Sequence, residues 1–235
     1  MLTFHHIRLS LRFLLKDKGF TVAALICIAL AIGSNVAVFS ILSAILLRPL
    51  PFAEPDRLMV LSDTHAGPGT ASEAFEVSPP NFDLWRRDAT SFSSLGAALP
   101  QSFAFSGGDE PEKIAGAAVS AGFFETLGVQ PVLGRTFTAE EDTPPGSDVV
   151  LISEGFWRTR LGGDPGVLGK TLRLDGKSYA VTGVVPSGFA FPQESRIWVP
   201  LALDPTREPQ RFFHVLLVYG RLAPGVSVER AQESM

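Results

Sequence analysis

The hydrophobic pattern of the chain is dominated by one long apolar run near the N-terminus. Residues 19–47 read GFTVAALICIALAIGSNVAVFSILSAILL and contain no charged side chain. About 20 apolar residues in a helix are enough to cross the hydrocarbon core of a bilayer, and a core helix of a soluble protein rarely stays uncharged for so long. The run therefore predicts a transmembrane helix over residues 19–47, either tilted or projecting beyond the membrane.

A cleaved secretory signal is the alternative interpretation of this run. Leu42-Ser43-Ala44 offers small residues of the kind found at a cleavage site. The apolar core of a signal peptide, however, spans only about 7–15 residues. The run is about twice as long, so the pattern favours a retained helix.

Charged residues are distributed unequally on the two sides of the run. The preceding side has an excess of basic residues over its single acid, Asp17, whereas the following side mixes Arg48 and Arg57 with several acids. Because an excess of Lys and Arg stays in the cytoplasm, we predict a cytoplasmic N-terminus and an extracytoplasmic main domain. The membrane-flanking basic residues are Arg8, Arg12, Lys16 and Lys18.

The first 18 residues also show helical periodicity. The stretch FHHIRLSLRFLLK, residues 4–16, has apolar residues near helical spacing and basic residues four apart. This pattern fits an amphipathic basic helix on the inner membrane surface. It fits a simple cytoplasmic extension of the span equally well.

Small residues recur every four positions inside the run, at Ala29, Gly33 and Ala37. This spacing allows a second helix to approach closely. Ser34 and Asn35 would also be better accommodated against protein than against lipid. We therefore expect a helix-packing face here, although alanine and glycine are common in membrane helices in any case.

Beyond the run, residues 48–235 alternate between short helical and strand-like patterns. Strands are predicted at 112–120 and 149–153, and the Asp175-Gly176 dipeptide between alternating runs predicts a hairpin over residues 171–185. These patterns predict an α+β fold, in which one N-terminal transmembrane helix precedes a mixed, mainly antiparallel sheet with short helices.

Helix boundaries in this part follow from capping residues. Three helices are expected to begin after the polar N-caps Asn81, Ser120 and Ser153, and a fourth after Ser227 near the C-terminus. Gly128 and Gly162 are the predicted terminators of the second and third helices.

The Gly169-Lys170-Thr171 tripeptide raises the question of a nucleotide-binding phosphate loop. That loop needs a glycine five positions before Gly169, and Asp164 stands there. A phosphate loop also follows a strand and opens a helix, whereas this tripeptide is predicted to follow a helix and open a strand. The sequence therefore predicts no cofactor bound by this chain.

Other catalytic patterns are equally weak. The pair His5 and His6 is expected to flank the N-terminal helix rather than to bind metal, and His65 lies in a polar loop. The single cysteine, Cys27, lies inside the apolar run, and the net charge of −4 gives no indication of nucleic-acid binding. His214 lies in a strand-like run and is expected to pack rather than to react. The acidic cluster Glu140, Glu141 and Asp142 is more typical of a solvated loop than of a metal site. We expect no catalytic, cofactor-binding or metal-ligating residues, and no enzyme.

An ordered series of stretches resembles the N-terminal part of MacB/FtsX-type ABC transporter permeases, and in particular acidobacterial orphan permeases. The resemblance covers nearly the whole chain. Its stretches are IRLSLRFLLKDKGFTVAALICIALAIGSNVAVFSILSAILLRPLPF, VSPPNFDLWRRDATSFSSLGA, VSAGFFETLGVQPVLGRTF, ISEGFWRTRLGGDPGVLGKTLRLDGKSYAVTGVVPSGFAFP and RLAPGVSVERAQ.

The resemblance implies a permease segment in the bacterial inner membrane, with three parts. These are a cytoplasmic helix at 1–18, a transmembrane helix at 19–47 and a periplasmic MacB-like core domain at 48–235, truncated at its C-terminal end. It further implies that a separate cytoplasmic ABC ATPase binds ATP and moves the periplasmic domain through the membrane helices, a process called mechanotransmission, for efflux or export. The implied partners are the lipid bilayer, that ATPase, and a homodimer or second permease half.

Two other functions remain open at this stage. A single-pass anchored binding or sensor domain fits the same layout, and the small-residue face of the helix argues only mildly against it. A secreted enzyme would need a clustered nucleophile and base, which the sequence does not display.

Overall fold

The computed structural model describes residues 18–46, 52–65, 73–107, 111–204 and 214–233. The chain divides into two compact units, Met1–Leu50 and Pro51–Met235. Each unit is described by itself below, and the second is called the outer domain. The predicted cytoplasmic helix at 1–18 lies outside the described residues except for Lys18.

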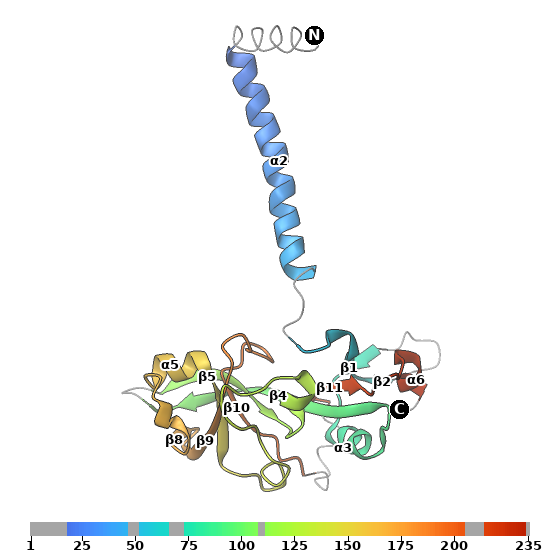
Figure 1. Ribbon diagram of the computed structural model, residues 1–235, viewed down its shortest axis with the longest axis vertical. Helices are drawn as coiled ribbons and strands as arrows, with labels where there is room; N and C mark the ends of the chain where they lie inside the picture. Colours follow the sequence, from blue (N-terminus) through green and yellow to red (C-terminus); the bar gives the residue numbers. More distant parts are fainter. Residues whose placement is uncertain (1–17, 47–51, 66–72, 108–110, 205–213, 234–235) are drawn as a thin grey trace. The chain divides into compact units, whose positions relative to one another are not determined.

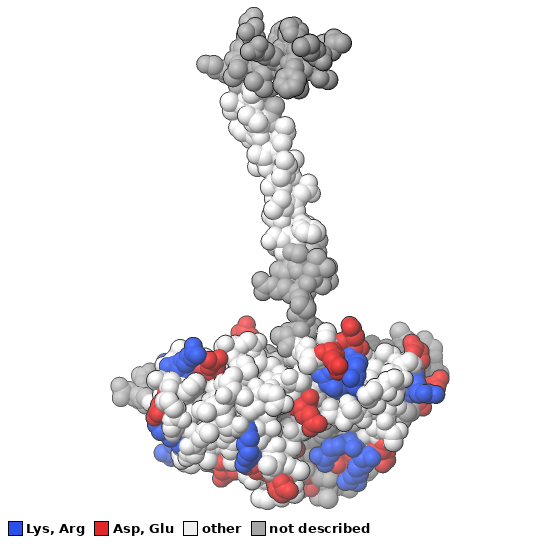
Figure 2. Space-filling view, in the orientation of Figure 1, with Lys and Arg blue, Asp and Glu red and all other residues white. Residues whose placement is uncertain are grey.

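The first unit contains one long helix, α2 (Lys18–Leu46). With a rise of 1.5 Å per residue its 29 residues extend about 44 Å. Its segment Thr21–Ser40 is long and apolar enough to cross a membrane by length and composition, and none of it is buried against other described parts of the chain. Figure 2 shows no charged side chain on the described surface of this helix, so the predicted apolar helix is confirmed.

The outer domain is built on a nine-stranded sheet with the order β1-β11-β4-β5-β10-β7-β9-β6, and β8 pairs with both β4 and β9. A separate two-stranded sheet joins β2 and β3. The strands are β1 (Leu58–Leu61), β2 (Asp63–His65), β3 (Glu73–Phe75), β4 (Phe92–Phe105), β5 (Glu112–Val119), β6 (Leu133–Gly134), β7 (Val149–Ser153), β8 (Thr171–Leu174), β9 (Lys177–Val185), β10 (Ile197–Pro200) and β11 (Leu217–Leu222).

Strand β8 closes part of the sheet on itself. It pairs along its length with β9 and meets β4 at the pair Phe105 and Leu174. The path of paired strands β4-β5-β10-β7-β9-β8 therefore returns to β4 and forms a small barrel. Most pairings are antiparallel, but β5 with β10 and β7 with β9 are parallel. The predicted α+β class with a mixed, mainly antiparallel sheet is confirmed.

Residues alternate between two cores along the barrel strands, because successive side chains of a strand point to opposite faces. In β10, Ile197 and Val199 join one cluster while Trp198 joins another. In β7, Ile152 belongs to the first cluster and Leu151 to the second. The first cluster fills the barrel and includes Phe156 of α5, and the second is covered by α4 and the segment 189–191.

Five short helices flank the sheet besides the 3-10 turn η1 (Pro55–Arg57): α3 (Pro79–Asp88), α4 (Phe123–Leu127), α5 (Glu154–Arg160), η2 (Pro165–Val167) and α6 (Val228–Glu233). Figure 1 shows α5, β8 and β9 at one end of the outer domain and β1, β2 and α6 at the other. The barrel thus occupies one end, and the edge strand β1 lies at the opposite end.

Several predicted caps are confirmed. The Ser153 side chain accepts a hydrogen bond from the Phe156 backbone N–H, and Ser227 Oγ accepts one from the Arg230 N–H at 3.4 Å. Gly128 ends α4 with φ +70°, and Gly162, just after α5, has φ +67°. Such positive φ values favour glycine because it has no Cβ.

Two predicted N-caps are wrong. Helix α3 begins at Pro79, three residues earlier than expected, because proline needs no N–H partner in the first helical turn. Asn81 instead donates to Asp63 Oδ1. Helix α4 begins only at Phe123, so Ser120 is not its N-cap. Ser120 Oγ accepts from the Ala97 N–H at 2.9 Å and fastens the end of β5 to β4.

The predicted hairpin over 171–185 is confirmed as β8 and β9. Asp175 and Gly176 both have positive φ, 51° and 80°, as a two-residue type I′ turn requires. Asp175 Oδ1 also accepts from the Ala104 N–H at 2.8 Å. The turn therefore supports the contact of β8 with β4 that closes the barrel.

The acidic cluster holds a loop together. Arg135 donates to both carboxylate oxygens of Glu141, at 2.7 and 2.8 Å, and the Thr138 N–H donates to Oε2 at 2.9 Å. The hydrogen bond with Arg135 lowers the pKa of Glu141 below its usual value. The expectation of an ordinary loop fits these contacts better than a metal site does.

We predict that Glu141→Gln lowers the free energy of unfolding by about 1 kcal/mol at pH 7. A folded-state pKa below the unfolded value gives stability that is present above the unfolded pKa, near 4.3, and is lost as pH falls through the folded pKa. The wild-type advantage should therefore shrink at pH 3. Urea unfolding followed by tryptophan fluorescence measures it, since Trp85, Trp157 and Trp198 all lie in the outer domain.

Glu112→Gln is the matched control, because Glu112 is also paired with an arginine, Arg160, but is far more exposed. Its effect should be smaller at pH 7. An equal difference between wild type and Glu141→Gln at both pH values would contradict the assignment.

Candidate functional site

The segment through which the chain enters the outer domain, residues 52–57, is fixed to the sheet by aromatic packing at its start. The Phe52 ring lies edge-on to Phe191 and Phe189, with centroids 5.6 and 6.4 Å away. Phe191 in turn lies 5.2 Å from Tyr219 of β11. Such pairs contribute roughly 0.5–1.5 kcal/mol beyond their area burial. The segment therefore begins on the core and not as a free linker.

Arg57 fixes the end of the same segment. Its Nε and Nη2 both donate to the Leu222 carbonyl oxygen, at 3.1 and 2.6 Å. Its Nη1 pairs with Glu54 Oε2 at 2.7 Å. One guanidinium thus joins the segment to the last residue of β11, and hydrogen bonds from a charged donor are stronger than neutral ones.

A second arginine, Arg221, reaches the segment from β11. Its Nε donates to the Thr126 carbonyl oxygen of α4 at 2.9 Å, and its Nη1 donates to the Glu54 carbonyl oxygen at 3.4 Å. We call Glu54, Arg57, Thr126, Arg221 and Leu222 the arginine clamp. It joins the incoming segment, a strand and a helix at one point.

The arginine clamp buries the positive charge of Arg221 without a close carboxylate partner in the part of the chain that the structure describes. Arg221 is 9% exposed, whereas its nearest carboxylate, Glu54 Oε2, is 3.8 Å away on a side chain that is 63% exposed. Among the described residues, Arg221 Nη2 and Thr126 Oγ1 are buried without a hydrogen-bond partner. Burying a charge that is weakly paired costs several kcal/mol. The clamp therefore depends on the surrounding packing to stay formed.

Backbone geometry around the clamp is equally constrained. Glu54 has φ 47°, in the left-handed region that non-glycine residues seldom occupy. A Cβ added at Gly128 would lie 2.7 Å from the Ala53 Cβ, and Gly128 itself has φ +70°. The incoming segment thus passes so close to the end of α4 that a side chain there would displace it.

Tyr219 lies behind the clamp on β11, packed against Phe123 and Phe191. Burial raises the pKa of its phenol to about 12. The phenol therefore stays neutral at physiological pH and adds no charge near Arg221.

The predicted helix-packing residues lie along α2. Ala29, Gly33 and Ala37 are exposed, and apart from the helix's own backbone no described atom lies within 4 Å of a Cβ placed on Gly33. Ser34 Oγ and Asn35 Nδ2 donate to the Ala31 carbonyl oxygen at 3.1 and 3.0 Å. Each of these two side chains thus has one hydrogen bond within its own helix. The packing face itself stays a prediction.

The predicted basic flank lies mostly outside the described residues. Arg8, Arg12 and Lys16 belong to residues 1–17, and Lys18 is the first residue of α2. Their role in membrane orientation stays a prediction.

The Gly-Lys-Thr tripeptide lies between a helix and a strand, as predicted. Thr171 begins β8, Lys170 pairs with Asp164, and the Gly166 N–H donates to Asp164 Oδ1 at 2.8 Å. The loop is held by its own side chains and does not open a helix.

The remaining candidates have structural contacts. His214 Nε2 lies 3.4 Å from Asp63 Oδ2, and Asp63 also accepts from the Ser78 N–H at 3.1 Å, so Asp63 holds the start of α3. In the part of the chain that the structure describes, no group of three or more His, Cys, Asp and Glu could hold a metal ion. Sequence reasoning missed the clamp arginines, although Arg221 stands at a buried position inside a strand-like run.

We predict that Arg57→Gln loosens residues 52–58, because it removes the ion pair with Glu54 and two hydrogen bonds to Leu222. Hydrogen–deuterium exchange of the full chain in nanodiscs should show amide protection in this segment falling about 10-fold or more, which corresponds to roughly 1.4 kcal/mol. Protection in the barrel strands β8 and β9 should not change.

Arg158→Gln is the control for this variant, since Arg158 forms a single ion pair on the exposed face of α5. It should leave the protection of residues 52–58 at the wild-type value. Equal protection in Arg57→Gln and wild type would show that the clamp does not hold the segment.

Two solved structures similar to this chain are extracytoplasmic parts of the proteins MacB and YknZ. The periplasmic region of MacB from Actinobacillus actinomycetemcomitans is 16% identical, with a TM-score of 0.55 over 75% of this chain and 79% of that one. The extracellular domain of the noncanonic ABC-type transporter YknZ from Gram-positive bacteria is 18% identical, with a TM-score of 0.50 over 68% of this chain and 78% of that one.

A third structure, a domain of a protein from Porphyromonas gingivalis assigned as a permease, is 20% identical, with a TM-score of 0.58 over 77% of this chain and 82% of that one. At these identities the likeness shows a shared fold. No curated protein sequence matches the chain.

The family profile described as the MacB-like periplasmic core domain matches residues 21–235, which include nearly all of α2 and the whole outer domain. This match agrees with the fold shared with the MacB and YknZ domains. The chain therefore belongs to the MacB-like periplasmic core domain family and is a segment of an ABC transporter permease of the MacB/FtsX type.

Proposed function

We propose that the outer domain is moved by a separate cytoplasmic ABC ATPase, that the motion reaches it through α2, and that it serves efflux or export. Membership of this permease family implies association with a membrane and with an ABC ATPase in general. ATP would be bound by that partner, since the Gly-Lys-Thr loop of this chain is occupied by the Lys170–Asp164 pair. The chain itself would relay motion and catalyse no reaction.

The arginine clamp is the observation that supports a mechanical role. Chain connectivity leads from α2 into residues 52–57, and these residues are held to β11 by Arg57 and Arg221. Arg221 extends the attachment to α4 through Thr126. A displacement of the incoming segment would therefore act on a central sheet and a helix, whereas a flexible linker would absorb it.

We propose that the membrane is the bacterial inner membrane, with residues 1–18 in the cytoplasm and the outer domain in the periplasm. The excess of basic residues before α2 supports this orientation. The lipid bilayer surrounds α2, and another helix, from a second copy or a second permease half, contacts the face with Ala29, Gly33 and Ala37.

We predict a specific labelling pattern for this orientation. The single native cysteine, Cys27, is first replaced in a Cys27→Ser background, and a cysteine is then introduced as Glu140→Cys or Lys16→Cys. A membrane-impermeant maleimide added to spheroplasts should label Glu140→Cys, because this position is exposed in the outer domain, and should label Lys16→Cys only after lysis. The reverse pattern would reject the orientation.

We further predict that nucleotide state changes the outer domain. The test uses the native permease with its ABC ATPase in nanodiscs, and compares hydrogen exchange of residues 52–61 and 214–222 without nucleotide and with ATP and vanadate. Protection in these segments should differ between the two states, and Arg57→Gln should reduce that difference while ATP hydrolysis continues.

Arg158→Gln should respond to nucleotide as wild type does. A wild-type outer domain with the same exchange in both nucleotide states would contradict mechanotransmission through the clamp.

A further inference from the structure

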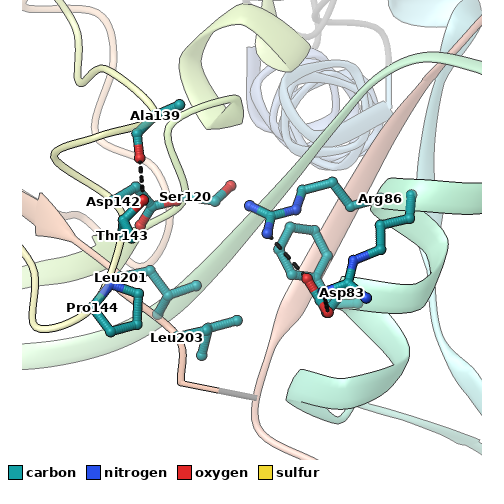
Figure 3. Close-up of a pocket in the computed structure, with 11 residues that line it drawn as sticks. Asp83, Arg86, Ser120, Ala139, Asp142, Thr143, Pro144, Leu201 and Leu203 are labelled. Carbon is teal, nitrogen blue, oxygen red and sulfur yellow. Dashed lines mark hydrogen bonds and ion pairs between the residues drawn. The ribbon is translucent and has the colours of Figure 1, made fainter. Parts of the chain in front are cut away.

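A cavity of about 380 Å³ opens between α3 and the loop 139–144. Figure 3 shows α3 side chains on one wall, loop side chains on the opposite wall, and leucines of the segment after β10 between them. No residue of the arginine clamp lines it, so it is separate from the proposed mechanical path. Its volume falls in the range of small-molecule sites.

The α3 wall has one surplus positive charge. Arg86 and Arg87 pair with the same carboxylate, Asp83, at 3.0 and 2.6 Å. The Arg86 guanidinium lies over the Phe82 ring, 5.8 Å from its centroid, and points into the cavity in Figure 3. Its bond to Asp83 uses one of five N–H donors. The Arg86 side chain is 53% exposed, so its other donors are accessible to a ligand and to solvent.

Acceptors on the opposite wall are already engaged. The two carboxylate oxygens of Asp142 accept from the backbone N–H groups of Ala121 and Ala202, at 3.0 and 2.8 Å. Ser120 Oγ accepts from the Ala97 N–H. Burial raises the pKa of Asp142, while its backbone hydrogen bonds and the Arg86 charge act in the opposite direction. The side chains of this wall therefore hold three backbone segments together by hydrogen bonds. They leave few acceptor atoms for a cationic ligand.

The remaining lining is apolar apart from Thr143, whose Oγ1 donates to the Ala139 carbonyl oxygen. Phe82, Pro144, Leu201 and Leu203 surround the space between the two walls. A ligand that fits must place an anionic group on Arg86 and an apolar group on these side chains. A dianion such as phosphate is less suited than a monoanion, because Asp83 neutralises one of the two arginines and Asp142 faces the site.

We propose that this cavity binds a small organic carboxylate, with the carboxylate hydrogen-bonded to Arg86 and a short apolar tail packed on Leu201, Leu203 and Pro144. A guanidinium presents paired N–H donors that match the two oxygens of a carboxylate. This site would give the outer domain a second function, the recognition of a small molecule, in addition to the proposed relay of motion. It does not depend on ATP or on the proposed relay.

Three probes of the same shape and different charge test the proposal: 3-phenylpropionate, 3-phenylpropan-1-ol and 3-phenylpropylamine. Their binding to the full chain in nanodiscs is measured by saturation-transfer NMR titration, with empty nanodiscs subtracted. The carboxylate should bind roughly 10-fold or more tightly than the alcohol, the size of effect expected of a charge-assisted hydrogen bond, and the amine should bind most weakly.

Variants assign the binding to the cavity. Arg86→Gln should weaken 3-phenylpropionate binding by about 10-fold or more and leave the alcohol unchanged, and Leu203→Trp should weaken all three probes by filling the cavity. Arg158→Gln, on a different helix, should bind as wild type does. Tryptophan fluorescence confirms that each variant is folded.

Four results would overturn the proposal. These are no binding of the carboxylate to the wild type, equal binding of the three probes, preference for the amine, and an Arg158→Gln variant that loses as much affinity as Arg86→Gln. None of these results bears on the nucleotide-dependent exchange experiment, so the two proposals can fail separately.

Discussion

A buried guanidinium joins three parts of the outer domain that are far apart in sequence. Arg221 reaches from β11 to the carbonyl oxygens of Thr126 and Glu54, so that a late strand, a central helix and the incoming segment meet at one side chain. Its charge is only weakly compensated, and its Nη2 has no partner among the described residues. An isolated buried charge of this kind is tolerated only where the surrounding structure holds it.

Barrel closure supplies that surrounding rigidity. The β8–β9 hairpin returns to β4, and the alternation of side chains along β5, β7 and β10 separates an interior core from the core that α4 covers. Phe52 packs on the second of these cores, and Arg57 is bonded to the end of β11. The incoming segment is thereby attached to a closed, well-packed body, and this attachment makes a relay of motion physically reasonable.

The cavity beside α3 differs from the arginine clamp in how its polar groups are paired. Arg86 on one wall has N–H donors that are accessible to a ligand, whereas the Asp142 carboxylate on the opposite wall already accepts hydrogen bonds from backbone N–H groups. Figure 2 shows mixed charges dispersed over the visible face of the outer domain, so a local imbalance inside a cavity is more informative than the net charge of −4. Mechanical coupling and recognition would then occupy separate regions of one domain.

The sequence alone was sufficient to predict the elements that depend on interactions between residues close together in the chain. The apolar run, the type I′ turn at Asp175-Gly176 and the cap at Ser153 follow from side chains within a few residues of each other, and the structure confirms them. The caps expected at Asn81 and Ser120 were wrong because α3 begins earlier and α4 later than expected, and the two side chains bond instead to Asp63 of β2 and Ala97 of β4. The clamp, the barrel closure and the cavity join residues far apart in sequence, such as Arg57 with Leu222 and Asp142 with Ala202. No pattern within a single segment specifies such pairs, because only burial of the common cores brings them within hydrogen-bonding distance.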